Sequence, residues 1–149
     1  MLAGKQGEQS EVILEQLRTK ATAGRVEYRG YVSDEERQRL YAEASMLVLP
    51  SLEEGFGMTA VEAMQAGVPV IASTRGALPE VAGDAGILVD PTSAADISAA
   101  IERLLDGTDE RRRRVEAGRA QAARFSWVGS ARTLMAAYRD ALARRQAGV

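Results

Sequence analysis

The chain has 149 residues, 46% of them hydrophobic, which is enough to bury the core of one compact domain without covalent or metal cross-links. It contains no cysteine and no histidine, which excludes a disulfide framework, a thiolate metal site and proton transfer by imidazole. The formal net charge of -2 gives no broad basic field, so we expect no nucleic-acid partner. Apolar runs fall short of the roughly 20 residues that span a bilayer and residues 1–25 lack an export signal, so we expect a cytoplasmic protein.

The N-terminal part of the chain predicts alternating strands and helices. Residues 2–3 have the character of a strand's tail, and a helix is indicated by apolar residues that recur near helical spacing. These residues are Val12, Ile13, Leu17 and Ala21. Residues 26–29 form a short β-type run, and Ser33 is then a good N-cap for a helix to residue 44, with Glu36 completing a capping box. We expect the first of these elements to be cut short.

Three continuous apolar runs predict the strands of a buried sheet. They are Met46–Leu49, Pro69–Ser73 and Gly86–Val89. Continuous rather than alternating apolar residues are typical of strands that are covered on both faces, as parallel sheets require. A loop and a helix of about twelve residues separate the first two runs. The alternation predicts an α/β fold with an open, doubly wound parallel sheet, because crossovers between parallel strands need such helices.

The remainder of the chain predicts helices. One covers residues 94–105, a charged segment begins at Asp109, and a C-terminal amphipathic helix covers residues 126–149. Its apolar positions are Val128, Ala131, Leu134, Met135, Tyr138 and Leu142. Acidic residues flank the run Arg111–Arg114, so a solvated helix face is favoured over a membrane or phosphate-binding patch. We predict a single domain over residues 1–149.

The stretch EEGFGMTAVEAM, residues 53–64, follows the first of the apolar strands and carries the polar residues of greatest interest. Gly55 and Gly57 permit backbone conformations closed to other residues and let a bound group approach the main chain. We predict Thr59 as the N-cap of the following helix, whose first amides and dipole would then form an anion site. Open α/β sheets place their ligands at this edge, beyond the carboxyl ends of the strands.

Two carboxylates, Glu54 and Glu62, complete the pattern. Glu54 would be repelled by a phosphate unless it faced a hydroxyl-rich part of the same ligand, and ionised carboxylates make strong hydrogen bonds to vicinal hydroxyls. A nucleotide sugar fits this arrangement. Structural alternatives stay open from spacing alone: Thr59 and Glu62 fit a capping box, Glu54 fits a surface loop, and Gly57 fits a simple turn. Hydrolysis by paired carboxylates is disfavoured, because no partner with a raised pKa is evident.

The segment LVLPSLEEGFGMTAVEAMQAGVPVIAS closely resembles the signature of retaining, nucleotide-sugar-dependent glycosyltransferases of the twin-Rossmann (GT-B) type, group 1 / family 4. Their pattern sets a Glu-x7-Glu pair inside P-S-x-x-E-G-F-G-x-x-x-x-E-A-M-A-x-G-x-P-V. The resemblance continues in VEYRGYVSDEERQRLYAEASMLVLPS and TRGALPEVAGDAGILVDPTSAADISAAIERLL, and so covers nearly the whole chain. It implies the Rossmann-like C-terminal domain that binds the donor, a nucleoside diphosphate sugar such as a UDP- or GDP-sugar, with no cofactor and no metal.

Residue roles follow from this resemblance. Glu62 would hold the ribose hydroxyls, and Glu54, as the catalytic residue, would touch hydroxyls of the donor sugar. The backbone that would contact sugar and diphosphate belongs to Gly55, Phe56, Gly57, Met58 and Thr59. The segment that would meet the nucleobase comprises Gly30, Tyr31 and Val32. Residues 73–80 resemble a donor-side loop in which Gly76 and Glu80 match, whereas Ala77 stands where a second glycine is common.

The resemblance also implies parts that this chain lacks. The family's domain begins with a further strand and helix that carry an arginine and a lysine, and an N-terminal domain binds the acceptor. Lys5 lies in the following loop and is interpreted as a solvated lysine rather than a substitute. We therefore expect an isolated chain that binds weakly and is inactive. Two other hypotheses remain, a non-catalytic nucleotide-sugar-binding module and an assembly domain, and an exposed apolar face would favour a homo-oligomer.

Overall fold

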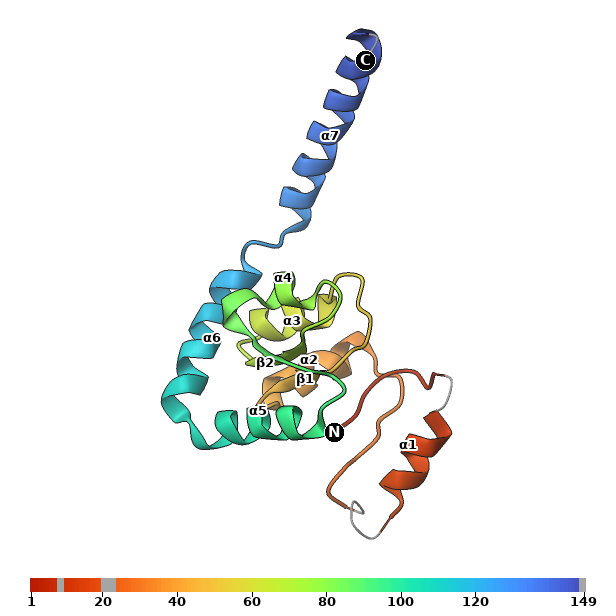
Figure 1. Cartoon of the computed structure of the whole chain (residues 1–149), viewed down its shortest axis with the longest axis vertical. Coiled ribbons are helices and arrows are strands. Elements are labelled where there is room, and N and C mark those ends of the chain that lie inside the picture. Colours follow the sequence, from red (N-terminus) through yellow and green to blue (C-terminus); the bar gives the residue numbers. More distant parts are fainter. Residues whose placement is uncertain (8–9, 20–23, 148–149) are drawn as a thin grey trace. The chain divides into compact units, whose positions relative to one another are not determined.

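The structure of the protein, a computed structural model, describes residues 1–7, 10–19 and 24–147. The chain divides into two compact units, Met1–Glu43 and Ala44–Val149, and each is described by itself. Figure 1 shows the elements in sequence colours. The expectation of one domain over the whole chain stays a prediction.

The first unit contains two helices, α1 (Ser10–Leu17) and α2 (Asp34–Glu43). Leu2 pairs with Tyr28 in a parallel bridge, in which the Leu2 amide donates to the Glu27 carbonyl at 2.7 Å. The predicted strand over residues 26–29 is therefore reduced to one bridge. The Ser33 N-cap is confirmed, because its hydroxyl accepts from the Glu36 amide at 3.2 Å. Ala21, predicted to continue the first helix, lies outside the described residues.

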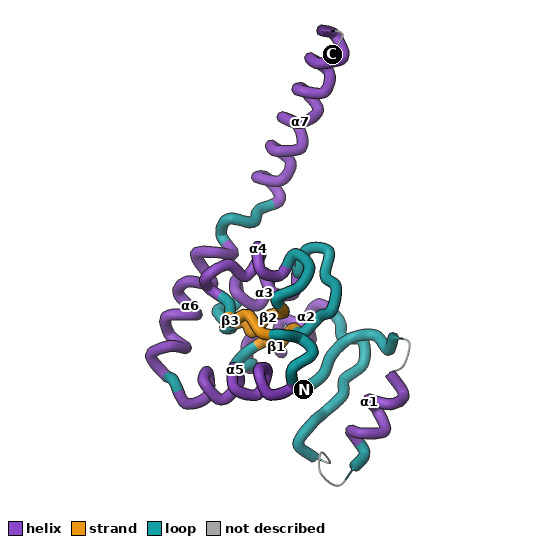
Figure 2. The backbone as a smooth tube through the Cα atoms, viewed as in Figure 1, coloured by secondary structure: helices purple, strands orange, loops and turns teal. Residues whose placement is uncertain are grey.

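The second unit is built on three parallel strands in the order β1 (Leu47–Leu49), β2 (Val70–Ser73) and β3 (Ile87–Val89). These are the three apolar runs, shortened at their ends. Figure 2 marks them in orange. The central strand β2 is buried along its whole length, which explains why its sequence does not alternate.

Helices cover both faces of this sheet, as the doubly wound prediction requires. Figure 1 shows α3 (Met58–Gln65) and α4 (Leu78–Ala82) on one side, and α5 (Ala94–Asp106) on the other. A short 3-10 turn, η1 (Gly83–Ala85), leads from α4 into β3. The core beneath α5 consists of Ile71, Ile87, Val89, Ala100 and Leu104. The helix between the first two strands has eight residues, shorter than predicted, because a long loop precedes it.

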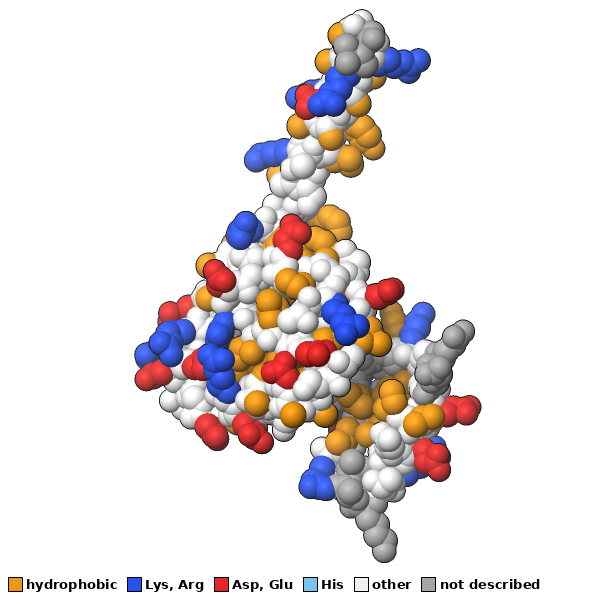
Figure 3. All heavy atoms as spheres, in the orientation of Figure 1, with side chains coloured by type: hydrophobic (Ala, Val, Ile, Leu, Met, Phe, Trp, Pro, Cys, Tyr) orange, Lys and Arg blue, Asp and Glu red, His pale blue; other side chains and the backbone are white. Residues whose placement is uncertain are grey.

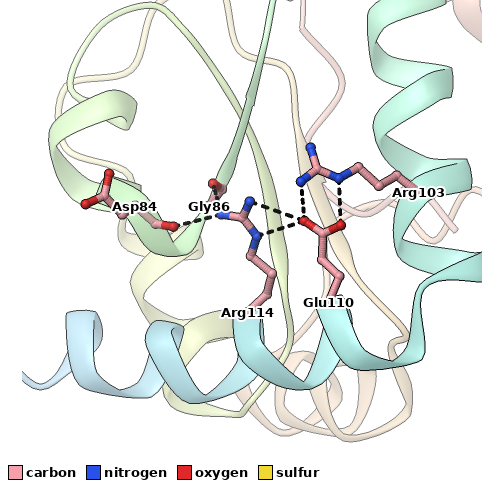
Figure 4. A network of polar contacts seen from close by, with 5 residues as sticks. All are labelled: Asp84, Gly86, Arg103, Glu110 and Arg114. Carbon is pink, nitrogen blue, oxygen red and sulfur yellow. Dashed lines mark hydrogen bonds and ion pairs between the residues drawn. The ribbon is translucent and has the colours of Figure 1, made fainter.

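Helix α6 (Thr108–Ala122) packs on α3, where Gly118 leaves room for Met64: a Cβ at position 118 would lie 3.2 Å from the Met64 Cγ. Charged side chains attach the N-terminal half of α6 to its neighbours. We call this group of Arg103, Glu110 and Arg114 the α6 clasp (Figure 4).

In the α6 clasp, Arg114 donates to the carbonyl oxygens of Asp84 at 2.7 Å and Gly86 at 2.8 Å. Glu110 accepts from Arg103, with Nε to Oε2 at 2.7 Å, and from Arg114. The bond from Arg103, ahead of that from Arg114, holds the pKa of Glu110 below its ordinary value. The prediction of a solvated arginine run is therefore wrong for Arg114, which is half-buried, while its three neighbours are exposed.

The last helix, α7 (Trp127–Ala147), begins after Ser126, whose hydroxyl accepts from the Gly129 amide at 3.0 Å. The predicted end at 148–149 lies outside the described residues. None of the α7 residues that the structure describes is buried, and Figure 3 shows uncovered hydrophobic side chains along it. Within the described part of the chain, no helix is both long enough and apolar enough for a membrane span.

Candidate functional site

The motif loop, residues 50–57, connects β1 to α3 at the carboxyl edge of the sheet. Helix α3 begins at Met58, and its N-cap is Gly57, with φ 95° and ψ 43°. The carbonyl oxygen of Gly57 accepts from the amides of Ala60 at 2.9 Å and Val61 at 3.3 Å. The positive end of the α3 dipole is therefore directed to the motif loop, at the edge where the sequence predicted an anion site.

The predicted N-cap is wrong, because Thr59 lies inside α3 and the cap has no side-chain hydrogen bond. The left-handed conformation of Gly57 starts the helix two residues earlier. Consequently Thr59 and Glu62 do not form the N-terminal capping box of α3, although each has a contact within the chain. Glu62 lies half-buried within the helix rather than in its first turn.

Gly57 is required at its position for two reasons. Its φ is unfavourable for residues with a side chain, and a Cβ would lie 2.7 Å from Leu78 Cδ2. Gly55 differs, since a Cβ there would have no described atom within 4 Å. The motif loop is thus tightly packed at Gly57 and open beside Gly55, so a group could approach the backbone on the Gly55 side.

The predicted donor-side loop, residues 73–80, contacts the motif loop through its backbone. The Ala77 amide donates to the Glu54 carbonyl at 3.0 Å, and a Cβ at Gly76 would lie 2.7 Å from that same oxygen. Ala77 has φ -81° and ψ -8°, an ordinary conformation for alanine, and caps α4. The glycine that the resemblance would place there is therefore not needed in this chain.

The side chain of Glu54 is half-buried, and its carboxylate makes no hydrogen bond or ion pair with any residue that the structure describes. Its backbone, by contrast, is fixed by Ala77 and Gly76. A carboxylate that stands on a fixed backbone and has no protein partner can accept hydrogen bonds from a ligand's hydroxyl groups. No group of three or more acidic side chains in the described ranges is arranged to hold a metal ion.

Sequence reasoning missed the contact between Phe56 and Phe125. Their rings meet edge to face, with centroids 5.6 Å apart and planes at 89°. Phe125 follows α6, far from the motif in sequence, and no local spacing pattern connects the two. The contact places the end of α6 beside the turn of the motif loop.

The predicted nucleobase segment belongs to the first unit and is described there alone. Gly30 has φ 66°, and its carbonyl accepts from the Gly4 amide at 2.8 Å. Tyr31 is 74% exposed, and the Nζ of Lys5 lies 5.3 Å from the centroid of its ring. Lys5 is exposed, as expected of a solvated lysine, and makes a cation–π contact. Val32 is half-buried.

A cavity of about 410 Å³ lies between α6 and the α4–η1 segment, and no residue of the motif loop lines it. It includes Glu80, which the resemblance assigned to the donor-side loop. The Gln121 side chain in this cavity donates to the carbonyl oxygens of Val81 at 3.0 Å and Glu80 at 3.3 Å. Arg124 donates to Gln121 at 3.0 Å. These side chains bond within the chain, so the motif loop remains the better candidate.

Known proteins place the chain in a family. The sequence model of the Glycosyl transferases group 1 family matches residues 1–121. O-antigen chain mannosyltransferase B from Escherichia coli is 40% identical over 139 residues, which are 93% of this chain and 36% of that protein. MMP alpha-(1->4)-mannosyltransferase from Mycolicibacterium hassiacum is 45% identical over 76% of this chain and 28% of that protein.

Solved structures agree on the fold. Sucrose-phosphate synthase from Thermosynechococcus elongatus superposes with a TM-score of 0.83 at 30% identity, over 95% of this chain and 38% of that one. The chain thus spans between 28% and 38% of the length of these three proteins. The predicted fold, an α/β, Rossmann-like fold like that of one half of a GT-B glycosyltransferase, is confirmed. The chain belongs to the Glycosyl transferases group 1 family.

Proposed function

We propose that this chain forms the donor-binding part of a retaining glycosyltransferase, which moves a glycosyl group from a nucleoside diphosphate sugar to an acceptor. The observation that carries the proposal is the Glu54 carboxylate, half-buried beside the N-terminus of α3 and without a protein partner among the described residues. Family membership supports the reaction class. The proposal concerns the donor side, because the chain spans 36% of its mannosyltransferase relative.

In this proposal the diphosphate binds the amides of residues 55–59 at the start of α3. Backbone donors and the helix dipole stabilise the negative charge that develops on the leaving diphosphate as the glycosidic bond breaks. Two points of the motif loop are fixed before the reaction, because Gly76 and Ala77 hold the Glu54 backbone and Gly57 packs against Leu78. This stabilisation needs neither a metal ion nor a cofactor.

The two carboxylates take complementary roles. Glu62 accepts hydrogen bonds from the ribose hydroxyls, and Glu54 from hydroxyls of the transferred sugar, which fixes the sugar against the diphosphate. A uridine nucleotide is the first donor to test, since Anabaena HepE, 22% identical with a TM-score of 0.79, was solved with UDP and glucose.

Isothermal titration of the 149-residue chain with UDP, UDP-glucose, GDP and GDP-mannose tests the proposal. We expect saturable binding of one nucleotide series. Glu62→Ala should weaken it about tenfold or more, because hydrogen bonds to charged groups contribute roughly 1.5–3 kcal/mol. Glu102→Ala, at an exposed acid on α5, is the matched control and should bind as the wild type does. No binding of any nucleotide, or equal binding by Glu62→Ala, would refute the proposal.

An assembly role is a second candidate, favoured by the exposed apolar residues of α7. Val128, Leu134 and Tyr138 are 60%, 53% and 57% exposed. Such side chains on one helix favour self-association. Light scattering after size-exclusion chromatography should show a homo-oligomer that Leu134→Glu dissociates. A monomer at high concentration would remove this candidate and leave donor binding unaffected.

A further inference from the structure

Two phenylalanines occur in the whole chain, and they contact each other. Phe56 lies in the turn of the motif loop, between two glycines, and is 42% exposed. Phe125 follows α6 and is half-buried. Their edge-to-face geometry, with centroids 5.6 Å apart, is a favourable arrangement for aromatic rings. The contact therefore connects the proposed diphosphate site with the end of α6.

Phe125 is attached to a firmly held element. Its amide donates to the Ala122 carbonyl at 3.0 Å, which continues the last turn of α6. The α6 clasp attaches that helix to Gly86, the residue before β3. Gln121 attaches it to α4 by donating to the Val81 carbonyl at 3.0 Å. It also packs on α3 at Gly118. The ring of Phe125 is thus fixed relative to α3, whose N-terminus forms the site.

Phe56 is attached to a far less constrained stretch. Gly57 is held as the N-cap of α3, but Gly55, on the other side of Phe56, allows the adjoining peptide plane wide rotation. No described atom would contact a Cβ at Gly55, so side-chain packing does not restrain the backbone there. The ring of Phe56 is the large side chain of this turn, and Phe125 is its aromatic partner. The orientation of the turn's amides consequently depends on where this ring is held.

We propose that Phe125 is a positioning residue: by holding the ring of Phe56, it keeps the amides of the Gly55–Gly57 turn directed at the diphosphate of the donor. The inference rests on the proposed function. Phe125 acts through Phe56, so its loss should weaken donor binding more than it weakens the fold. A purely structural contact would do the reverse, lowering stability and leaving the affinity of the folded protein unchanged.

Titration of the 149-residue chain with UDP-glucose tests this. Phe125→Leu, which removes the ring and keeps an apolar side chain, should weaken affinity about three- to tenfold, as expected from the loss of one aromatic pair. Phe125→Tyr preserves the ring edge and should bind within about twofold of the wild type. The control is Trp127→Leu, because Trp127 is an aromatic residue close by in sequence that is 82% exposed, and it should bind normally.

Phe56→Leu provides an independent variant that leaves α6 unchanged. It should lose as much affinity as Phe125→Leu, and the double variant should lose no more than either, because both remove one interaction. Urea unfolding of each variant confirms that it is folded. Equal affinity of Phe125→Leu and the wild type would overturn the proposal, as would equal losses in Phe125→Leu and Phe125→Tyr.

A ligand-free arm separates this inference from the proposed function. Amide hydrogen exchange of Phe56 and Gly57, measured by NMR, should be faster in Phe125→Leu than in the wild type or Trp127→Leu. If the wild type binds no nucleotide and exchange is still faster, the proposed function fails and the positioning of the turn stands. Exchange at the wild-type rate in Phe125→Leu overturns the positioning, whatever the wild type binds.

Discussion

The motif loop and the α6 clasp are both held against neighbouring segments of the chain, but by different groups. In the α6 clasp, Glu110 and two arginines satisfy one another and two backbone carbonyls. In the motif loop, the fixing contacts come from backbone and glycine: the Ala77 amide bonds to the Glu54 carbonyl, and Gly76 lies against it. The Glu110 carboxylate is therefore bound by protein side chains, whereas no described contact that holds the motif loop uses the Glu54 carboxylate.

This difference separates structural acids from candidate ligand-binding acids in one small protein. A structural carboxylate has a cationic partner and a lowered pKa, as Glu110 has. A carboxylate for a sugar needs a fixed backbone and an unoccupied side chain, as Glu54 has within the described residues. In the sequence, nothing but their neighbours distinguishes the two glutamates.

The largest expected loss of stability comes from forcing the motif loop and the donor-side loop, residues 73–80, apart. In Gly76→Ala the new Cβ would lie 2.7 Å from the Glu54 carbonyl oxygen at a φ of 61°. The left-handed conformation costs about 1–2 kcal/mol and the overpacking about 1–3 kcal/mol. We expect a loss of about 3 kcal/mol in the free energy of unfolding, measured in urea. Gly55→Ala, with open space at its Cβ, should change it by less than about 0.5 kcal/mol; a similar loss in both would contradict the account.

Glu54→Gln should separate binding from stability. We expect UDP-glucose affinity to fall about tenfold, because a charge-assisted hydrogen bond to the sugar becomes a neutral one. The melting temperature should stay within about one degree of the wild type, since the carboxylate pairs with no described residue. Glu53→Gln, its exposed neighbour, should leave both quantities unchanged. Calorimetric titration measures the affinity and a thermal scan the melting temperature. A marked loss of stability in Glu54→Gln would show that its carboxylate contributes to the fold.

Glu110→Gln should show the opposite behaviour. Its folded pKa is lowered, chiefly by Arg103, so its contribution to stability is present above the ordinary carboxyl pKa of about 4.3 and disappears as the pH falls through the lowered value. Melting curves should place the variant a few degrees below the wild type at pH 7, with the difference vanishing in acid, and donor affinity should be retained. Glu116→Gln, an exposed acid on the same helix, serves as the control. A pH-independent difference would rule out this ionic origin.

The sheet could be predicted from sequence because burial on both faces leaves a direct mark. Val70 to Ser73 contains no charged residue, and the structure buries all four. The Ser33 cap was equally readable, since its signal is local. The site geometry was only partly readable. The positions of the glycines in the sequence do not reveal that Gly57, rather than Thr59, is the N-cap of α3.

Contacts between distant segments left no such mark. Gly76 against Glu54 and Phe56 against Phe125 join residues that local periodicity cannot relate. The sequence does not distinguish Arg114 from the other three arginines of its run. In the structure it alone of the four bonds to the carbonyls of Asp84 and Gly86. Its role is visible only in the fold, which brings η1 and Gly86 beside α6.

NMR titration of the isotope-labelled chain with UDP-glucose tests the central claim most directly. The account predicts that the largest amide shifts map to residues 55–59, and that UDP alone shifts the same amides while leaving Glu54 nearly unchanged. Shifts confined to the cavity around Gln121 and Asp84, or a spectrum without shifts at the motif loop under saturating ligand, would contradict it.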